Sequence, residues 1–249
     1  MYDYPYERKG LRMSTHTTTP ARAAGGPHPG ILGLASLGLL IGSLISMAVL
    51  SGGGTITSPF GDTGTVAGFF ADHGFAARFA SMLQLGSAIP LGIYAATVYA
   101  RQQRLGIRVP GPGIGLFGGT AAAILLAVSA IITWTQSQPV VSADPELTHA
   151  LAYASFAAGG FAHVLGLGLL VAGIAVPALL LRLVPTWFAW VGLVIAVLAE
   201  LSFLTMVIEP LQVLIPIGRF GSLIWLVAAG FLLPETRHTE SRQTQGARA

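Results

Sequence analysis

Residues 163–201 read HVLGLGLLVAGIAVPALLLRLVPTWFAWVGLVIAVLAEL, which is two long apolar runs joined by a short connection. Within this stretch, Arg182 and Glu200 are the only residues of the Lys, Arg, Asp or Glu types. A transmembrane helix needs about 20 predominantly apolar residues, because it must cross a hydrocarbon core about 30 Å thick. Each run meets that length, so the stretch predicts a hairpin of two transmembrane helices.

The same pattern continues in both directions along the 249-residue chain. Hydrophobic residues make up 53% of it and charged residues 9%, whereas about a quarter of the residues are charged in ordinary soluble proteins. This composition excludes a water-soluble core. Six apolar windows predict transmembrane helices at residues 31–51, 74–100, 113–135, 150–178, 186–207 and 211–233. We expect an all-α, polytopic six-transmembrane-helix bundle over residues 31–233, flanked by disordered cytoplasmic tails at residues 1–30 and 234–249.

The basic residues predict the orientation of this bundle, because Lys and Arg in short loops accumulate on the cytoplasmic side while Asp and Glu contribute little. Of the 13 basic residues, only Arg78 and Arg219 fall near the opposite side. The others lie in the two tails and in the second and fourth connections: Arg8, Lys9, Arg12, Arg22, Arg101, Arg104, Arg108, Arg182, Arg237, Arg242 and Arg248. Both termini are therefore expected to be cytoplasmic.

The amino-terminal segment has a second interpretation, since a basic stretch followed by an apolar run also begins a secretory signal. Residues 31–50 are long for the apolar region of such a signal, and no clear small-x-small cleavage site follows them. These features favour a retained membrane helix. Met13 is an alternative start.

Composition also limits the chemistry of the chain. Cysteine is absent, and Lys9 in the tail is the only lysine, so neither a disulfide nor a retinal Schiff base within the bundle is possible. The net charge of +3 fits basic loops that face anionic lipid rather than a nucleic-acid surface. We expect membrane lipids as partners, a homodimer or a larger membrane complex as an option, no nucleic acid and no cofactor. An enzyme is disfavoured, because no nucleophile, metal cluster or acid–base pair is evident.

Ionisable side chains within apolar segments are candidates for function, because retaining them in a membrane is costly. The candidates, with one neutral companion, are Arg78, His163, Glu200, Arg219 and Gln84. If the chain reverses near Pro210, a rise of about 1.5 Å per residue puts Glu200 and Arg219 at similar depth. We predict a polar pocket, open to the extracytoplasmic side, that binds or transports a small amphiphile or ion. A purely structural ion pair stays open, as does no contact at all if the sixth helix begins at Pro216.

Two other functions stay open. One is an accessory or sensory subunit, whose polar residues are structural and whose helices pack against a larger membrane complex. The other is a haem protein, because His149 and His163 are fourteen residues apart on one helical face, as in di-haem cytochromes b. Four ligands are required there, and only His73 remains outside the tails, which excludes two haems. A single haem between His73 and His149 stays as the third interpretation.

Small residues recur at a spacing that permits close approach of two transmembrane helices. Gly38, Gly42 and Ser46 form one such stripe, and Ala162 with Gly166 forms another. Tight packing within the bundle is the expected role of both stripes, and a dimer seam is the alternative.

Two short motifs resemble a known family. Residues 163–167 read HVLGL and residues 185–192 read PTWFAWVG, and both are similar to a bacterial group of six-helix membrane proteins catalogued as a domain of unknown function. The likeness extends more loosely to the second helix, from Gln84 to Tyr99 and Arg101, and covers most of residues 31–233. It implies the six-helix layout, a tight turn at Pro185 and a bacterial cytoplasmic (inner) membrane. It implies no established activity, and neither Glu200 nor Arg219 matches its motifs.

Overall fold

The computed structural model describes residues 26–53 and 58–235, and this part of the chain is helical throughout its regular elements. Six helices are long and apolar enough to cross a membrane: Pro29–Leu50, Gly74–Arg104, Gly111–Gln136, Pro145–Leu180, Thr186–Met206 and Glu209–Leu232. Each predicted window falls on one of them. The all-α, six-span fold class is therefore confirmed, whereas the predicted disorder of the tails concerns residues that lie mostly outside the described ranges.

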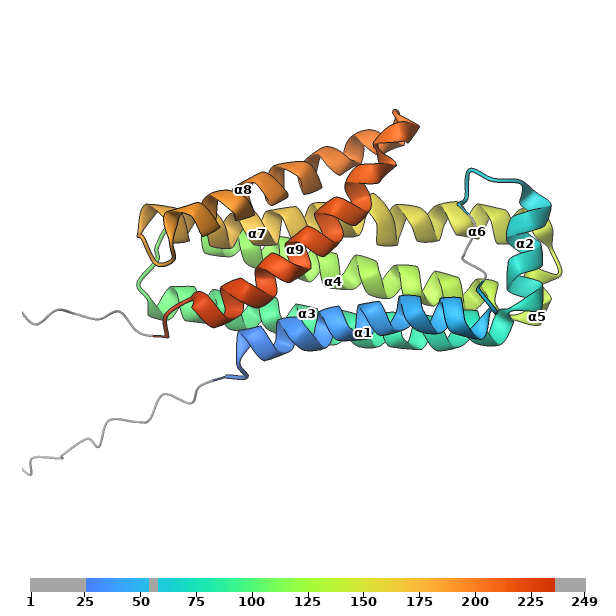
Figure 1. Ribbon diagram of the computed structural model, residues 1–249, viewed down its shortest axis with the longest axis horizontal. Helices are drawn as coiled ribbons and strands as arrows, with labels where there is room; N and C mark the ends of the chain where they lie inside the picture. The colour runs from blue at the N-terminus through green and yellow to red at the C-terminus, as the bar shows by residue number, and fades with distance from the viewer. Residues whose placement is uncertain (1–25, 54–57, 236–249) are drawn as a thin grey trace, which may run out of the picture.

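The elements in chain order are α1 (Pro29–Leu50), α2 (Thr63–Asp72), α3 (Gly74–Arg104), α4 (Gly111–Gln136), α5 (Pro139–Ser142), α6 (Pro145–Ala157), a π-helical turn (Ala158–Ala162), α7 (His163–Leu180), α8 (Thr186–Leu201), two 3-10 turns (Ser202–Met206 and Glu209–Val213) and α9 (Leu214–Leu232). The spans lie roughly side by side, and α9 crosses the others obliquely (Figure 1).

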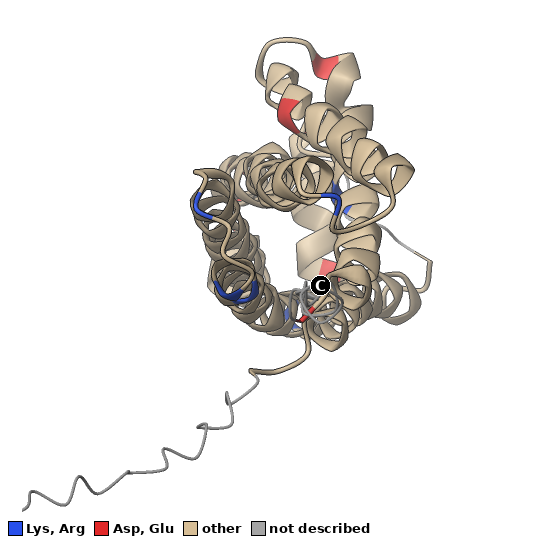
Figure 2. Ribbon diagram, turned by 90° about the vertical axis from the view of Figure 1, so that its left-hand side faces the viewer, with Lys and Arg blue, Asp and Glu red and all other residues tan. Residues whose placement is uncertain are grey.

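The described chain begins and finishes at one end of the bundle, which we call the terminal end, while α2 and α5 lie at the opposite end, which we call the α2 end (Figure 1). Arg104, at the end of α3, and the connections that carry Arg108 and Arg182 are also at the terminal end, which faces the viewer in Figure 2. The basic connections thus share one end, as the sequence predicted. Which end faces the cytoplasm stays a prediction.

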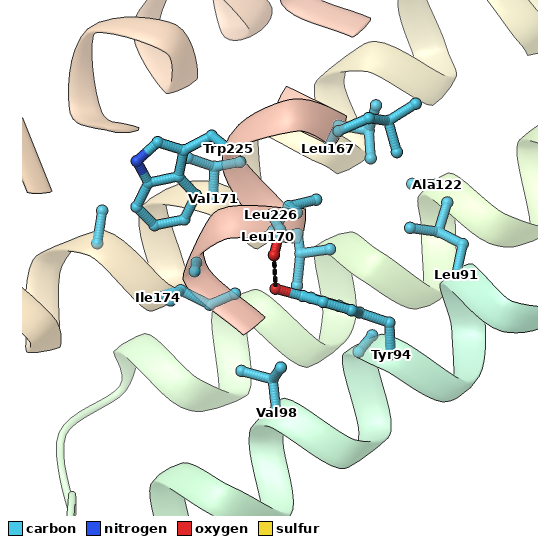
Figure 3. Close-up of a cluster of buried hydrophobic side chains, with 14 of the residues drawn as sticks. Leu91, Tyr94, Val98, Ala122, Leu167, Leu170, Val171, Ile174, Trp225 and Leu226 are labelled. Atoms are coloured by element: carbon cyan, nitrogen blue, oxygen red, sulfur yellow. Dashed lines mark hydrogen bonds between the residues drawn. The ribbon is translucent and has the colours of Figure 1, made fainter. Parts of the chain in front are cut away.

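Hydrogen bonds to main-chain carbonyls fix α9 against α3 and α8. The Tyr94 hydroxyl, fully buried, donates to the Leu226 carbonyl at 2.7 Å (Figure 3). Nearer the terminal end, Arg101 Nη1 donates to the Leu233 carbonyl at 3.0 Å. On the other side, Trp225 stacks on Phe188 and its indole N–H donates to the Phe188 carbonyl at 2.9 Å. Each bond satisfies a polar group that would otherwise be costly to bury in an apolar bundle.

The helix α2 is an element that the sequence analysis did not predict. Asp62 caps its first turn by accepting from the Thr65 amide at 3.1 Å, which is a favoured role for Asp. Val66 and Phe70 are buried in a cluster that also contains Ala77 of α3. The helix therefore packs across the ends of the spans and covers the bundle at the α2 end.

The two predicted stripes of small residues have different outcomes. A Cβ atom at Gly38 would have no neighbour within 4 Å, and one at Gly42 would meet only Leu83 at 3.8 Å, so close packing of α1 through these residues is wrong. Around Gly166 the prediction is confirmed, since a Cβ atom there would lie 2.7 Å from the Gly118 carbonyl of α4. The α4–α7 contact is thus a close approach of two backbones, whereas Gly38 and Gly42 bring no backbone close to α1.

Candidate functional site

The five predicted site residues lie in three separate places. Arg78 is at the α2 end, in the first turns of α3. Gln84, His163 and Arg219 surround the π-helical turn, and Glu200 lies between α7 and α8. The structure therefore does not bring all five into one pocket.

Glu200 does not form the predicted ion pair with Arg219. Among the described residues, the only salt bridge joins Arg101 Nη2 and Glu235 at 3.6 Å. One carboxylate oxygen of Glu200 is buried without a hydrogen-bond partner in the described chain, packed against Gly168 of α7. The depth estimate holds, since a Cβ atom at Gly218 would lie 3.0 Å from the Ala199 Cα. The ion pair does not form because the side chains of Glu200 and Arg219 face different neighbours.

Arg219 instead stabilises the π-helical turn. Gly160 inside that turn has φ −80° and ψ −110°, which interrupts the regular helix. The Arg219 guanidinium on α9 donates through Nη2 to the Gly159 carbonyl. The helix α9 begins at Leu214, two residues before the alternative start at Pro216. Pro216 is in the first turn of α9, and Arg219 is in the second. Arg219 is thus paired with main chain and not with a carboxylate.

Gln84 belongs to a polar network around the same turn. Its side-chain amide Nε2 donates to Ser129 Oγ at 3.2 Å, and Ser129 Oγ lies 3.1 Å from Ser155 Oγ. Thr133 Oγ1 lies 2.8 Å from Ser155 Oγ. These hydroxyl residues were not predicted, although Ser129 and Thr133 are four residues apart and so lie on one face of α4. Gln84 and Thr133 also line a cavity of about 280 Å³ between α1, α3 and α4.

His163 has a packing role in this geometry. Its ring is fully buried, and Nδ1 donates to the Ala122 carbonyl of α4 at 2.8 Å, because a carbonyl can only accept. Nε2 has no partner among the described residues. The one hydrogen bond joins α7 to α4 beside their close backbone contact.

His149, one of the two candidate haem ligands, has partners at both of its ring nitrogens. His149 Nδ1 lies 2.7 Å from Thr63 Oγ1, and its Nε2 lies 2.7 Å from the Pro59 carbonyl. Both ring nitrogens are therefore engaged, and His149 joins the start of α2 to α6 rather than presenting a free nitrogen to iron.

Arg78 lies between two cavities at the α2 end. Its Nη1 donates to the Ser137 carbonyl at 3.0 Å, and no other hydrogen bond of its guanidinium is found in the described chain. On one side is a polar cavity of about 400 Å³, bordered by the ends of α2 and α3 and by the α4–α5 connection. On the other is an apolar groove of about 570 Å³ between α3 and α4. Arg78 lines both.

The groove opens on the outer surface of the bundle. It is lined by Arg78, Ser81, Met82, Leu85, Ala130, Ile131 and Trp134. Met82 is 57% exposed and Trp134 is 49% exposed. The groove is therefore accessible from outside the bundle along α3 and α4.

We compared the chain with known protein families, curated proteins and solved structures. None of them matches. The family resemblance of residues 163–167 and 185–192 therefore stays a prediction.

Arg219 gives a test of the π-helical turn. We expect Arg219→Leu to lower the free energy of unfolding by about 1–2 kcal/mol, because the Gly159 carbonyl loses its side-chain donor inside an apolar bundle. Glu200→Leu should cost less, since the buried Glu200 oxygen has no described partner to lose. Thermal unfolding of both variants in detergent measures the difference, and a smaller loss for Arg219→Leu than for Glu200→Leu would contradict this role.

Proposed function

We propose that the protein binds a membrane amphiphile at the α2 end, with the anionic part of the headgroup on Arg78 and one apolar chain in the α3–α4 groove. The observation that carries the proposal is that a single guanidinium borders both a polar cavity and an apolar groove. This is the arrangement that an amphiphile requires, because its two parts must be bound by adjoining surfaces of opposite polarity.

The chemistry of Arg78 supports an anionic group as its ligand. A guanidinium carries five N–H donors in a planar fork that suits phosphate and carboxylate oxygens. Ser137 uses one of the donors on Nη1, and the guanidinium is only partly exposed, which strengthens a charge-assisted bond. The two cavities, about 400 and 570 Å³, are within the usual range for small-molecule sites.

The depth of the site supports a lipid-like ligand. Arg78 lies four residues after the start of α3, or about 6 Å along the helix axis. Trp134 is in the last turn of α4, and tryptophan is enriched at membrane interfaces. A ligand here would lie with its headgroup at the interface and its chain in the hydrocarbon, as membrane lipids do.

The proposal keeps the predicted class of ligand and changes the residues that bind it. Arg78 is the central residue of the proposed site, and Gln84 lines a neighbouring cavity. His163, Glu200 and Arg219 are not part of it. With both termini cytoplasmic in a bacterial inner membrane, the α2 end and its ligand would lie on the extracytoplasmic side. Binding alone accounts for this geometry, so transport is not part of the proposal.

A groove-filling substitution tests the apolar half of the site. We expect Met82→Trp to lower retention of bound phospholipid about three- to tenfold, because the larger ring occupies the space of the chain. Ile89→Trp is the matched control, since Ile89 is 63% exposed on α3, comparable to Met82, but does not line the groove. Native mass spectrometry of the detergent-purified proteins counts the bound lipids. Equal retention by the two variants would exclude the groove as a binding surface.

A further inference from the structure

The polar cavity contains two opposite charges that do not neutralise each other. Asp72 ends α2 and Arg78 lies in the second turn of α3, and both line the cavity of about 400 Å³. In the described chain they form no ion pair with each other, and Arg78 bonds to the Ser137 carbonyl instead. Asp72 is exposed, and its carboxylate has no hydrogen-bond or ion-pair partner among the described residues. The cavity therefore offers a cation and an anion as separate binding groups.

We infer that this cavity selects a headgroup with both a phosphate and a primary ammonium group, as in a phosphoethanolamine lipid. The inference rests on the proposed function and names the substrate class of that site. Arg78 binds the phosphate oxygens, and the Asp72 carboxylate accepts from the ammonium N–H groups. The two protein charges are then matched in sign by the two ligand charges, within one cavity that adjoins the apolar groove.

Two other common headgroups fit this cavity less well. A headgroup with phosphate and only hydroxyls leaves Asp72 unpaired and adds a negative charge beside it, which is unfavourable. A quaternary ammonium has no N–H to donate and is usually held by several aromatic faces. Here Phe75 is 64% exposed, whereas Phe70 is 2% exposed and packs edge-to-face against Phe69. One accessible ring does not make an aromatic cage, so the carboxylate favours the primary amine.

Competition between lipids of different headgroup tests the inference. The full-length protein is titrated in detergent with phosphatidylethanolamine, phosphatidylglycerol and phosphatidylcholine of identical chains, and bound lipid is counted by native mass spectrometry. We expect the native protein to prefer phosphatidylethanolamine over each of the others by about two- to fivefold, the worth of one exposed ion pair. Asp72→Asn should remove that preference while leaving phosphatidylglycerol binding equal or stronger. Glu146→Gln, an exposed carboxylate at the same end of the bundle, should change neither.

The outcomes separate this inference from the proposed function. If the native protein shows no preference for phosphatidylethanolamine, or if Asp72→Asn lowers the binding of all three lipids equally, the headgroup assignment is overturned. If lipid binding still depended on Met82 and Arg78, the proposed amphiphile site would be retained without its headgroup preference. Water-soluble glycerophosphoethanolamine serves as a further arm, and we expect it to compete at least tenfold more weakly than the lipid because it lacks the chain. Equal competition would show that the chain contributes nothing, which overturns the assignment to a lipid.

Discussion

Arg78→Gln is expected to lower the affinity for phospholipid about tenfold, whichever headgroup the lipid carries. Glutamine is a polar, uncharged residue with a helix propensity close to that of arginine, so α3 itself is preserved. The variant loses the positive charge and the planar fork, and hydrogen bonds to charged groups are worth about 1.5–3 kcal/mol. A loss of about 1.4 kcal/mol corresponds to the tenfold change.

Arg108→Gln is the control for this variant. It removes the same charge at the terminal end of the bundle, where Arg108 is exposed and lines neither the groove nor the polar cavity. Retained lipid, measured by native mass spectrometry over a lipid titration, should be unchanged for Arg108→Gln. If the two variants lost lipid equally, the effect would be one of net charge, and Arg78 would not be a ligand-binding residue.

Gly173→Leu is expected to have the largest effect on stability, about 3 kcal/mol or more. A Cβ atom at this position would lie 2.4–2.6 Å from the main-chain N and Cα of Gly115 and the carbonyl oxygen of Gly111. The main chain of a packed helix cannot move aside as a side chain can, so α4 and α7 would have to separate. This separation of α4 and α7 would also disturb the hydrogen bond, 3.1 Å long, that Gln102 Nε2 donates to the Gly173 carbonyl.

Gly38→Leu is the matched substitution on α1, where a new Cβ atom meets nothing within 4 Å. Its melting temperature in detergent should equal or exceed that of the native protein, because leucine is the better helix former by about 1 kcal/mol. A large loss for Gly38→Leu, with a change from dimer to monomer by native mass spectrometry, would show that this face is a dimer seam. A small loss for Gly173→Leu would contradict the close α4–α7 contact.

The spans were predictable because a membrane imposes one simple requirement, a run of about 20 apolar residues for each crossing. The 10-residue α2 escaped prediction because it does not cross the membrane and has too short an apolar face to stand out. The π-helical turn also escaped prediction, since residues 158–162 read AGGFA within an apolar run that is equally compatible with a regular α-helix.

The candidate residues were predictable and their partners were not. Their charge within apolar segments was enough to single out Arg78 and Arg219. Partners depend on which neighbour each side chain faces: Glu200 packs against Gly168 of α7, whereas Arg219 donates to the Gly159 carbonyl. The groove beside Arg78 depends on how Met82 and Trp134 pack across α3 and α4, and no local pattern of the sequence specifies that.

A high-resolution structure of the protein in lipid nanodiscs tests the central claim most directly. The amphiphile site predicts elongated density along the α3–α4 groove, beside Met82 and Trp134, that continues into headgroup density within hydrogen-bond distance of Arg78. A groove closed by those side chains, with the Arg78 guanidinium bonded only to the Ser137 carbonyl, would contradict it.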